Sequence, residues 1–171
     1  MKTLFLQVIL FFILINFGCV ESNSQASKSA DTIKTINTMN TVNWSILSSG
    51  NQCGVETAKN VLIKTQAQFD ALWQECFQNM PVGNEKPDVD FSKDWVVGVF
   101  LGTINKGGHN IAIEDLKETE NGLKAALTHT KPGSNCLTTM SIEFPYIIAR
   151  VKQFRPDTIE YDIADKTVDC N

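Results

Sequence analysis

The feature that most constrains the fold is a short apolar run at residues 95–101, which is followed by a glycine-rich segment. The run is rich in β-branched and aromatic residues and is too short for a typical globular helix, so we expect a strand buried on both faces. Residues 105–108 contain two adjacent glycines, which supply the positive φ angles that a tight reversal needs. After them Ile111 and Ile113 alternate with smaller or polar residues, as in a strand with one face in water. The sequence therefore predicts a hairpin with Gly-Gly-His at its tip.

One segment has the periodicity of an amphipathic helix. Thr65 and Gln68 have the spacing of a capping box, in which Thr65 accepts from the backbone of Gln68 and the Gln68 side chain reaches back. The apolar residues that follow form one stripe at helical spacing: Phe69, Leu72, Trp73, Cys76 and Phe77. Such a stripe is far more often core than a ligand site. A single helix with this face must pack on a sheet, so we expect the partner of Cys76 in the sheet or in a segment that crosses the helix.

Shorter patterns predict the remaining elements. Strands are expected at residues 42–47, 60–64, 123–130, 143–153 and, at an edge, 158–163, with turns at 48–51 and 120–122 and loops at 81–87 and 131–140. Together they predict an α+β fold, in which a mainly antiparallel sheet of about six or seven strands carries one amphipathic helix. We expect a single domain at residues 42–171.

The N-terminal residues are not expected to belong to the fold. Lys2, an apolar core at residues 4–17 and the Gly-Cys pair at 18–19 predict a bacterial lipoprotein signal, in which Cys19 is lipidated. The alternative is ordinary cleavage that leaves Cys19 as a free thiol. Residues 20–41 are mostly polar, which predicts a flexible tether. The sequence thus predicts an exported, lipid-anchored protein of the bacterial cell envelope, at the outer membrane or the cell surface.

Charge and cysteine usage limit the partners. The formal net charge is −4 and there is no basic run, so we expect no nucleic acid, and the lipid would be the only membrane contact. An even number of further cysteines in an exported chain predicts two disulfides, with the pairing left open among Cys53, Cys76, Cys136 and Cys170. Each of these cysteines is isolated, and no Cys-x-x-Cys or Cys-x-x-His pair occurs. We therefore expect no metal and no cofactor.

The order of the strands predicts which loops meet. The strand that ends at residues 105–108, the return strand and the strand that begins at residue 123 alternate in direction. The loop at 131–140 should therefore lie at the same end of the domain as the glycine turn. Loops that cluster on a rigid scaffold are common sites of function.

The sequence does not argue for an enzyme. It contains no Gly-x-Ser-x-Gly elbow, no His-Glu-x-x-His, no phosphate-binding glycine loop and no dinucleotide fingerprint. His109 could act as a base with Cys136 as nucleophile if the two loops meet, but a polar residue beside a turn and a disulfide cysteine are the plainer interpretation. We expect His129 to be solvated or partly buried at a strand end. The acidic residues between 114 and 120 are most simply a solvated hairpin face.

Four short motifs resemble the PrcB family. They are Val-Val-Gly-Val-Phe-Leu-Gly at 96–102, Gly-Gly-His-Asn-Ile-Ala-Ile at 107–113, Lys-Pro-Gly at 131–133 and Phe-Pro-Tyr-Ile-Ile at 144–148. In that family a strand ending in Gly leads to a Gly-Gly-aromatic turn, then a Pro-Gly loop, then a Ser/Thr-Pro-Tyr strand. The resemblance covers roughly residues 90–153. This chain departs from it at His109, where an aromatic residue is usual, and at Phe144, where Ser or Thr is common.

The resemblance implies a non-catalytic lipoprotein subunit that binds and stabilises a protease or its precursor at the cell surface. With the predicted loop cluster it points to these binding residues: Asn105, Lys106, Gly107, Gly108, His109, Lys131, Pro132, Gly133, Pro145 and Tyr146. Glycines would let a partner backbone approach and would offer it N–H and C=O groups. The other interpretation is that they only make the turn. The alternative function is a protease inhibitor whose loops enter an active-site cleft.

Overall fold

The computed structural model describes residues 40–80 and 85–170. These residues form, in chain order, β1 (Asn40–Thr41), β2 (Trp44–Gly50), β3 (Lys59–Ile63), α1 (Gln66–Phe77), β4 (Asp94–Phe100), β5 (Asn110–Thr119), β6 (Gly122–Pro132), β7 (Tyr146–Lys152) and β8 (Ile159–Val168). The α+β class predicted from the sequence is confirmed. The predicted lipoprotein signal, including Cys19, and the tether up to residue 39 lie outside the described residues. The last two residues of the expected tether form β1, which pairs with β5.

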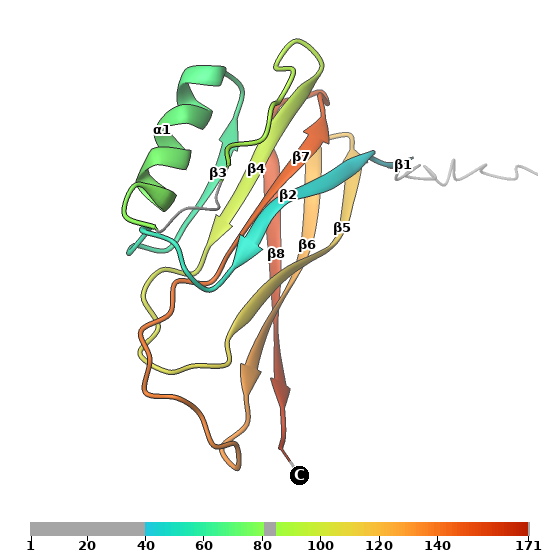
Figure 1. The fold of residues 1–171 in the computed structure, drawn as a ribbon. Helices are drawn as coiled ribbons and strands as arrows, with labels where there is room; N and C mark the ends of the chain where they lie inside the picture. The colour runs from blue at the N-terminus through green and yellow to red at the C-terminus, as the bar shows by residue number, and fades with distance from the viewer. Residues whose placement is uncertain (1–39, 81–84, 171) are drawn as a thin grey trace, which may run out of the picture. The chain divides into compact units, whose positions relative to one another are not determined.

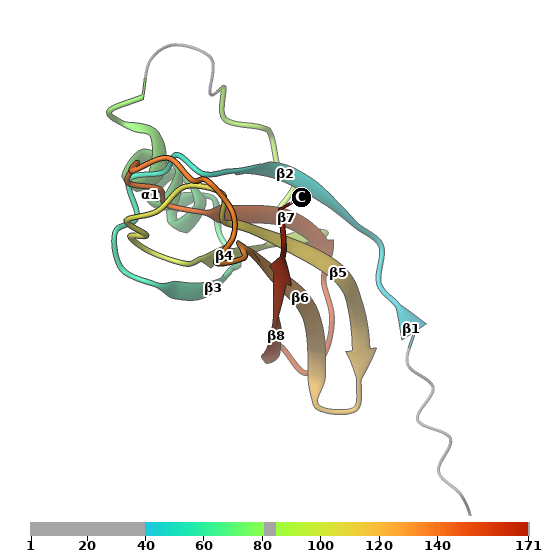
Figure 2. The ribbon, with the colours of Figure 1, turned by 90° about the horizontal axis from the view of Figure 1, so that it is seen from below.

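The strands form two four-stranded sheets. We call the sheet with strand order β1-β5-β6-β8 sheet A and the sheet with order β2-β7-β4-β3 sheet B. Neighbouring strands are antiparallel except for β6 and β8, which run parallel. Helix α1 packs on one face of sheet B and sheet A packs on the other, as the views in Figures 1 and 2 show.

The predicted hairpin between residues 95–101 and the strand after the glycines is wrong. β4 and β5 lie in different sheets, and residues 101–109 cross from sheet B to sheet A. β4 pairs with β3 along one edge and with β7 along the other, so no edge remains for β5. The prediction that this strand is buried on both faces is confirmed, since every residue of β4 is buried.

β4 is buried on both faces because it lies between two apolar cores. Val96 and Phe100 pack in the core beneath α1, whereas Val97 and Val99 pack in the core between the two sheets. This alternation follows from the pleat of a strand, which directs successive side chains to opposite faces.

Helix α1 begins where the capping pattern predicts. The Thr65 hydroxyl accepts from the Gln68 backbone N–H at 3.3 Å. The Gln68 side chain accepts from the Lys64 backbone N–H at 3.0 Å, one residue before the predicted partner. The whole predicted apolar stripe is buried against sheet B.

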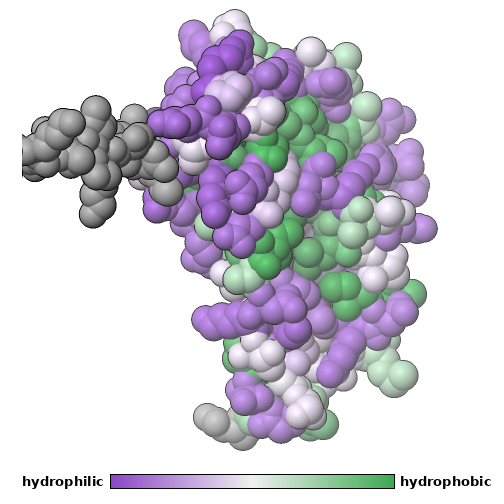
Figure 3. Space-filling model, turned by 180° about the vertical axis from the view of Figure 1, so that it is seen from behind, coloured by the Kyte–Doolittle hydropathy of each residue, from purple (hydrophilic) through white to green (hydrophobic). Residues whose placement is uncertain are grey.

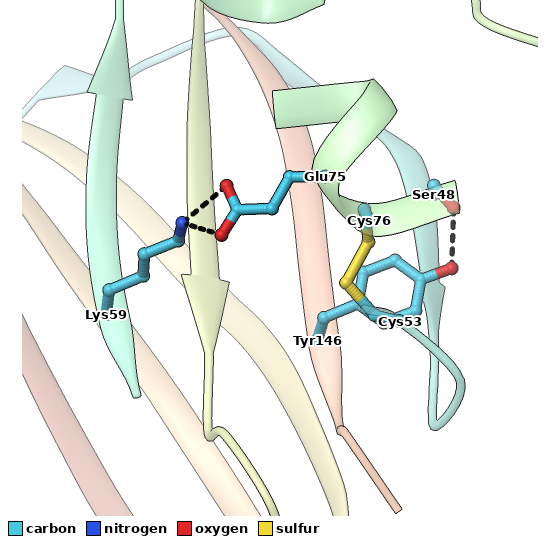
Figure 4. The surroundings of a disulfide bond; sticks show 6 residues. All are labelled: Ser48, Cys53, Lys59, Glu75, Cys76 and Tyr146. Carbon is cyan, nitrogen blue, oxygen red and sulfur yellow. Dashed lines mark hydrogen bonds and ion pairs between the residues drawn. A yellow bond between two sulfur atoms is a disulfide. The ribbon is translucent and has the colours of Figure 1, made fainter. Parts of the chain in front are cut away.

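Figure 4 shows a disulfide, an ion pair and a hydrogen bond near α1. The disulfide Cys53–Cys76 ties the helix to the connection between β2 and β3. The Lys59 ammonium donates to both carboxylate oxygens of Glu75, at 2.6 and 2.7 Å. Tyr146 and Ser48 share a hydrogen bond of 2.9 Å between their hydroxyls.

Several of the predicted strand ends differ from the structure. The turn at 120–122 is confirmed by the pairing of Thr119 with Gly122, but the turn expected at 48–51 is wrong because β2 continues to Gly50. The C-terminal edge strand exists and is longer than predicted, reaching Val168. Within the described part of the chain, no helix combines the length and the apolar character that crossing a membrane requires.

Candidate functional site

Two loops from distant parts of the sequence meet at one end of the fold. They are residues 101–109, between β4 and β5, and residues 133–145, between β6 and β7, and both lie at the lower end in Figure 1. Ile104 and Glu143 exchange two backbone hydrogen bonds of 2.8 Å, and the Gly107 N–H donates to the Thr139 carbonyl at 3.0 Å. The predicted juxtaposition of residues 105–109 with residues 131–140 is confirmed. We call residues 101–109 and 133–145 together the loop surface.

The Glu143 side chain forms hydrogen bonds with the backbone of the first loop, residues 101–109. Its carboxylate is nearly buried, and its two oxygens accept from the backbone N–H groups of Gly108 and His109, both at 3.3 Å. A carboxylate is expensive to bury unless donors surround it, and backbone N–H groups are suitable donors. The Glu143 contacts therefore fix the loop conformation.

The two adjacent glycines have different roles. A Cβ atom on Gly107 would lie 2.1 Å from the Thr139 hydroxyl oxygen, so there is no space for a side chain there. Gly108 has a φ of +94°, a conformation that side-chain-bearing residues rarely adopt. The N–H groups of both glycines are bonded within the loops, which favours the interpretation that these residues shape the turn.

The loop surface exposes apolar side chains and contains a pocket. The pocket has a volume of about 440 Å³ and is lined by both loops and by the ends of β6 and β8, including Gly108, Pro132, Leu137 and Val168. Leu137 and Met140 are fully exposed, at 104% and 102%. Figure 3 shows hydrophobic residues at the surface of the side opposite to that in Figure 1, including its lower end. Large apolar side chains exposed close together in the sequence, as in this loop, suit a protein-interaction site.

The second loop is held by several bonds to the C-terminal end. Cys136 forms a disulfide with Cys170, and the Asn135 amide donates to the Cys170 carbonyl at 2.6 Å. The Gly133 N–H donates to the Val168 carbonyl at 2.8 Å. The disulfide prediction is confirmed, and the pairing that the sequence left open is Cys53 with Cys76 and Cys136 with Cys170. In this disulfide Cys136 is not a thiol, so it cannot serve His109 as a nucleophile.

A chain of hydrogen bonds links the end of the first loop to β6 and β8. His109 Nδ1 lies 3.0 Å from His129 Nε2, and His129 Nδ1 lies 2.9 Å from an Asp165 oxygen. The other Asp165 oxygen accepts from the Lys131 ammonium at 2.7 Å. Burial and the neighbouring His129 lower the pKa of His109, and the contacts with Lys131 and His129 lower the pKa of Asp165.

Sequence reasoning placed His129 at a strand end but did not connect it with Asp165. The connection arises because β8 joins β6 in parallel, with His129 opposite Asp165. The histidine and aspartate positions were visible in the sequence, but the direction of β8 was not. Among residues 40–80 and 85–170 no group of three or more His, Cys, Asp or Glu side chains is arranged to hold a metal ion.

Two of the predicted binding residues are buried. Pro145 is buried, and its carbonyl accepts from the Leu101 N–H at 3.0 Å. Tyr146 is only 5% exposed, and its ring packs between Phe77 and Phe100 in the core beneath α1. Both residues support the fold and are not exposed to a partner. The other predicted residues, in the segments 105–109 and 131–133, are brought together at that surface.

Residues 95–152 match the family model described as PrcB C-terminal. The matched segment runs from β4 to β7 and contains both loops, whereas α1 and β8 lie outside it. No curated protein and no solved structure matched the chain.

Proposed function

We propose that this chain is a non-catalytic accessory subunit that binds a protease or its precursor, because residues 95–152 match the family model described as PrcB C-terminal. The observation that carries the proposal is the loop surface, where apolar side chains that the fold does not need for its own core are exposed beside a pocket. The matched family segment contains both loops, which supports their use in the common role of the family.

In this proposal Leu137 and Met140 are the apolar anchors that enter the partner, and the pocket receives a side chain from it. A few well-packed apolar contacts usually supply most of the binding energy of a protein interface. The disulfide Cys136–Cys170 and the Glu143 contacts hold the loops before binding. A preorganised surface loses less conformational entropy on association than a flexible one.

We further propose that Cys19 carries a lipid and that the residues after it tether the domain to the bacterial envelope. The proposal rests on the apolar N-terminal segment that ends in Gly-Cys. Attachment to the membrane would raise the local concentration of the domain near a membrane-bound protease. Mass spectrometry of the chain extracted from membranes tests this directly, because an unmodified N-terminus or an intact signal would contradict it.

The test of partner binding uses residues 20–171 as bait in extracts of envelope membranes. We expect a defined partner with protease activity or a protease-precursor sequence, and we expect the double variant Leu137→Asp/Met140→Asp to lose it. The matched control is Ile46→Asp, since Ile46 is also an exposed apolar residue, at 53%, but lies in β2 of sheet B. Circular dichroism checks that each variant is folded. No partner above background, or equal binding by the double variant, would contradict the proposal.

A protease inhibitor is the second candidate function. A disulfide-held loop with exposed Leu137 next to Cys136 also suits insertion into an active-site cleft. Titration of the purified domain against serine and cysteine proteases separates the two functions. Stoichiometric inhibition favours the inhibitor, whereas a bound partner that keeps its activity favours the accessory subunit.

A further inference from the structure

β8 forms one edge of sheet A and is paired on one side only. Its pairing with β6 is continuous over all ten residues without a register shift, and most of its residues are exposed. Within residues 40–80 and 85–170 no strand pairs with its other side. Figure 1 shows the lower end of this strand leading to the C-terminus. An unpaired edge presents backbone N–H and C=O groups that another strand can bond.

The hydrogen bonds to β6 show which residues of β8 direct their backbone N–H and C=O groups toward the free edge. The Thr158 carbonyl accepts from the Leu123 N–H at 2.9 Å, and the Val168 carbonyl accepts from the Gly133 N–H at 2.8 Å. Successive residues of a strand direct their backbone groups to opposite sides. Even-numbered residues of β8 therefore bond to β6, and the odd-numbered residues direct their N–H and C=O groups to the free edge: Ile159, Tyr161, Ile163, Asp165 and Thr167.

The other sheet edges carry protective features that β8 lacks. β2 has a register shift between Ile46 and Ser48, and β5 has one between Ile113 and Asp115 as well as a short partner in β1. β3 has only five residues. Bulges and short strands are common means of preventing edge-to-edge association. β8 has no bulge, proline or glycine, and the disulfide at Cys170 holds the chain just beyond its end.

The sequence of β8 is complementary to itself in one antiparallel register. With Ile163 opposite its own copy, Tyr161 lies opposite Asp165 and Glu160 lies opposite Lys166. The residues whose backbone groups point to the free edge then face one another as hydrogen-bonded pairs. The Glu160–Lys166 pair occurs twice. Lys166 has no ion pair within the described residues, and Glu160 has only a 3.9 Å contact with Lys124. Ile163, which is 39% exposed, would be covered.

Neighbouring registers are less favourable. A shift that places Ala164 opposite its own copy sets Asp162 against Lys166 but places Ile163 opposite Asp165. A shift in the other direction leaves Lys166 without an acidic residue opposite it. The charge pairs and the apolar contact between the two copies of Ile163 therefore both favour the register centred on Ile163.

We propose that two copies of this chain associate through antiparallel pairing of their β8 edges, which joins their two sheets A into one continuous sheet. The two-fold axis passes through Ile163, and the paired charges lie on the outer face of the joined sheet. The interface goes beyond the proposed binding of a protease, because its pairing residues lie in β8 and include neither Leu137 nor Met140.

The test is the concentration dependence of mass for residues 20–171, which contain all of the described fold, by sedimentation velocity across the micromolar range. We expect a reversible dimer. Lys166→Glu should weaken it at least about tenfold, because like charges then face each other twice. The double variant Glu160→Lys/Lys166→Glu restores opposite charges and should recover dimerisation to near the wild-type level.

A backbone variant tests the edge itself. Ile163→Pro removes an N–H that points away from β6, so the internal ladder is kept while the free edge is blocked. We expect a folded monomer. A wild-type chain that is monomeric at all concentrations would overturn the proposal, and so would a dimer insensitive to Lys166→Glu or one that the charge swap fails to restore. A monomer whose β8 edge captures a different protein would also overturn it, and the loop-surface variants would still report on protease binding.

Discussion

Removal of the Cys136–Cys170 disulfide gives a quantitative test of how firmly the loop surface is held. The double variant Cys136→Ser/Cys170→Ser opens a loop whose ends are separated by 34 residues, for which the chain-entropy model gives about 3.8 kcal/mol at 25 °C. A crosslink stabilises the native state by this amount only if the fold already holds its two ends together. The structure shows that it does, because residues 133 and 135 hydrogen-bond to residues 168 and 170.

Urea denaturation followed by tryptophan fluorescence measures this loss. We expect a lower midpoint at a nearly unchanged slope, with the unfolding free energy reduced by roughly 3–4 kcal/mol. The matched control is Cys53→Ser/Cys76→Ser, whose separation of 23 residues gives about 3.4 kcal/mol from entropy alone. That variant should lose more in total, because both cysteines are 1% exposed and the new hydroxyls would be buried.

The reasoning would be refuted by a loss below about 1 kcal/mol for the Cys136/Cys170 variant, because the loop would then be loose in the native state despite its hydrogen bonds. A larger loss of unfolding free energy in the Cys136/Cys170 variant than in the Cys53/Cys76 variant would contradict the argument from burial. Both variants need to fold at low temperature for the comparison, which circular dichroism establishes.

Three further predictions concern single side chains. Gly107→Ala should destabilise the fold by about 1 kcal/mol through its contact with the Thr139 hydroxyl, and Thr139→Ala in the same chain should recover much of it by thermal unfolding. His109 has a folded pKa below its usual 6.5, so the stability it contributes is present above that pH and is lost as the pH falls through the lower folded pKa. His109→Gln should therefore show a flatter dependence of the unfolding free energy on pH, measured in urea from about pH 7 to about pH 5, and an unchanged dependence would count against this. Tyr146→Phe removes the hydrogen bond to Ser48 and should lower the unfolding free energy by about 1 kcal/mol, whereas no loss in urea denaturation would show that the bond is dispensable.

The sequence predicted individual elements better than their partners. The apolar stripe of α1 and the burial of β4 on both faces follow from local periodicity, which side-chain patterns encode directly. The pairing of β4 was wrong because a buried strand has two edges, and its pattern does not say which strands occupy them. The parallel direction of β8 was missing for the same reason, since alternation is the same in either direction.

The meeting of the two loops was predicted correctly although the hairpin was not. The alternating directions of three successive strands are sufficient for this prediction, and β4, β5 and β6 alternate even though β4 and β5 lie in different sheets. The sequence could not show that Glu143 and Thr139 use the amides of residues 107–109. Nor could it show that Tyr146 belongs to the core, because a Pro-Tyr motif reads alike in a loop and at a strand start.

Amide hydrogen exchange by NMR tests most directly whether the two loops form one fixed surface. In the wild-type chain the amides of Gly107, Gly108 and His109 should all be protected, because they bond to Thr139 and Glu143. In Glu143→Ala, Gly108 and His109 should lose their protection while Gly107 keeps its bond to the Thr139 carbonyl. Rapid exchange of all three amides in the wild-type chain would contradict the account, because the loops would then open independently and present no common surface.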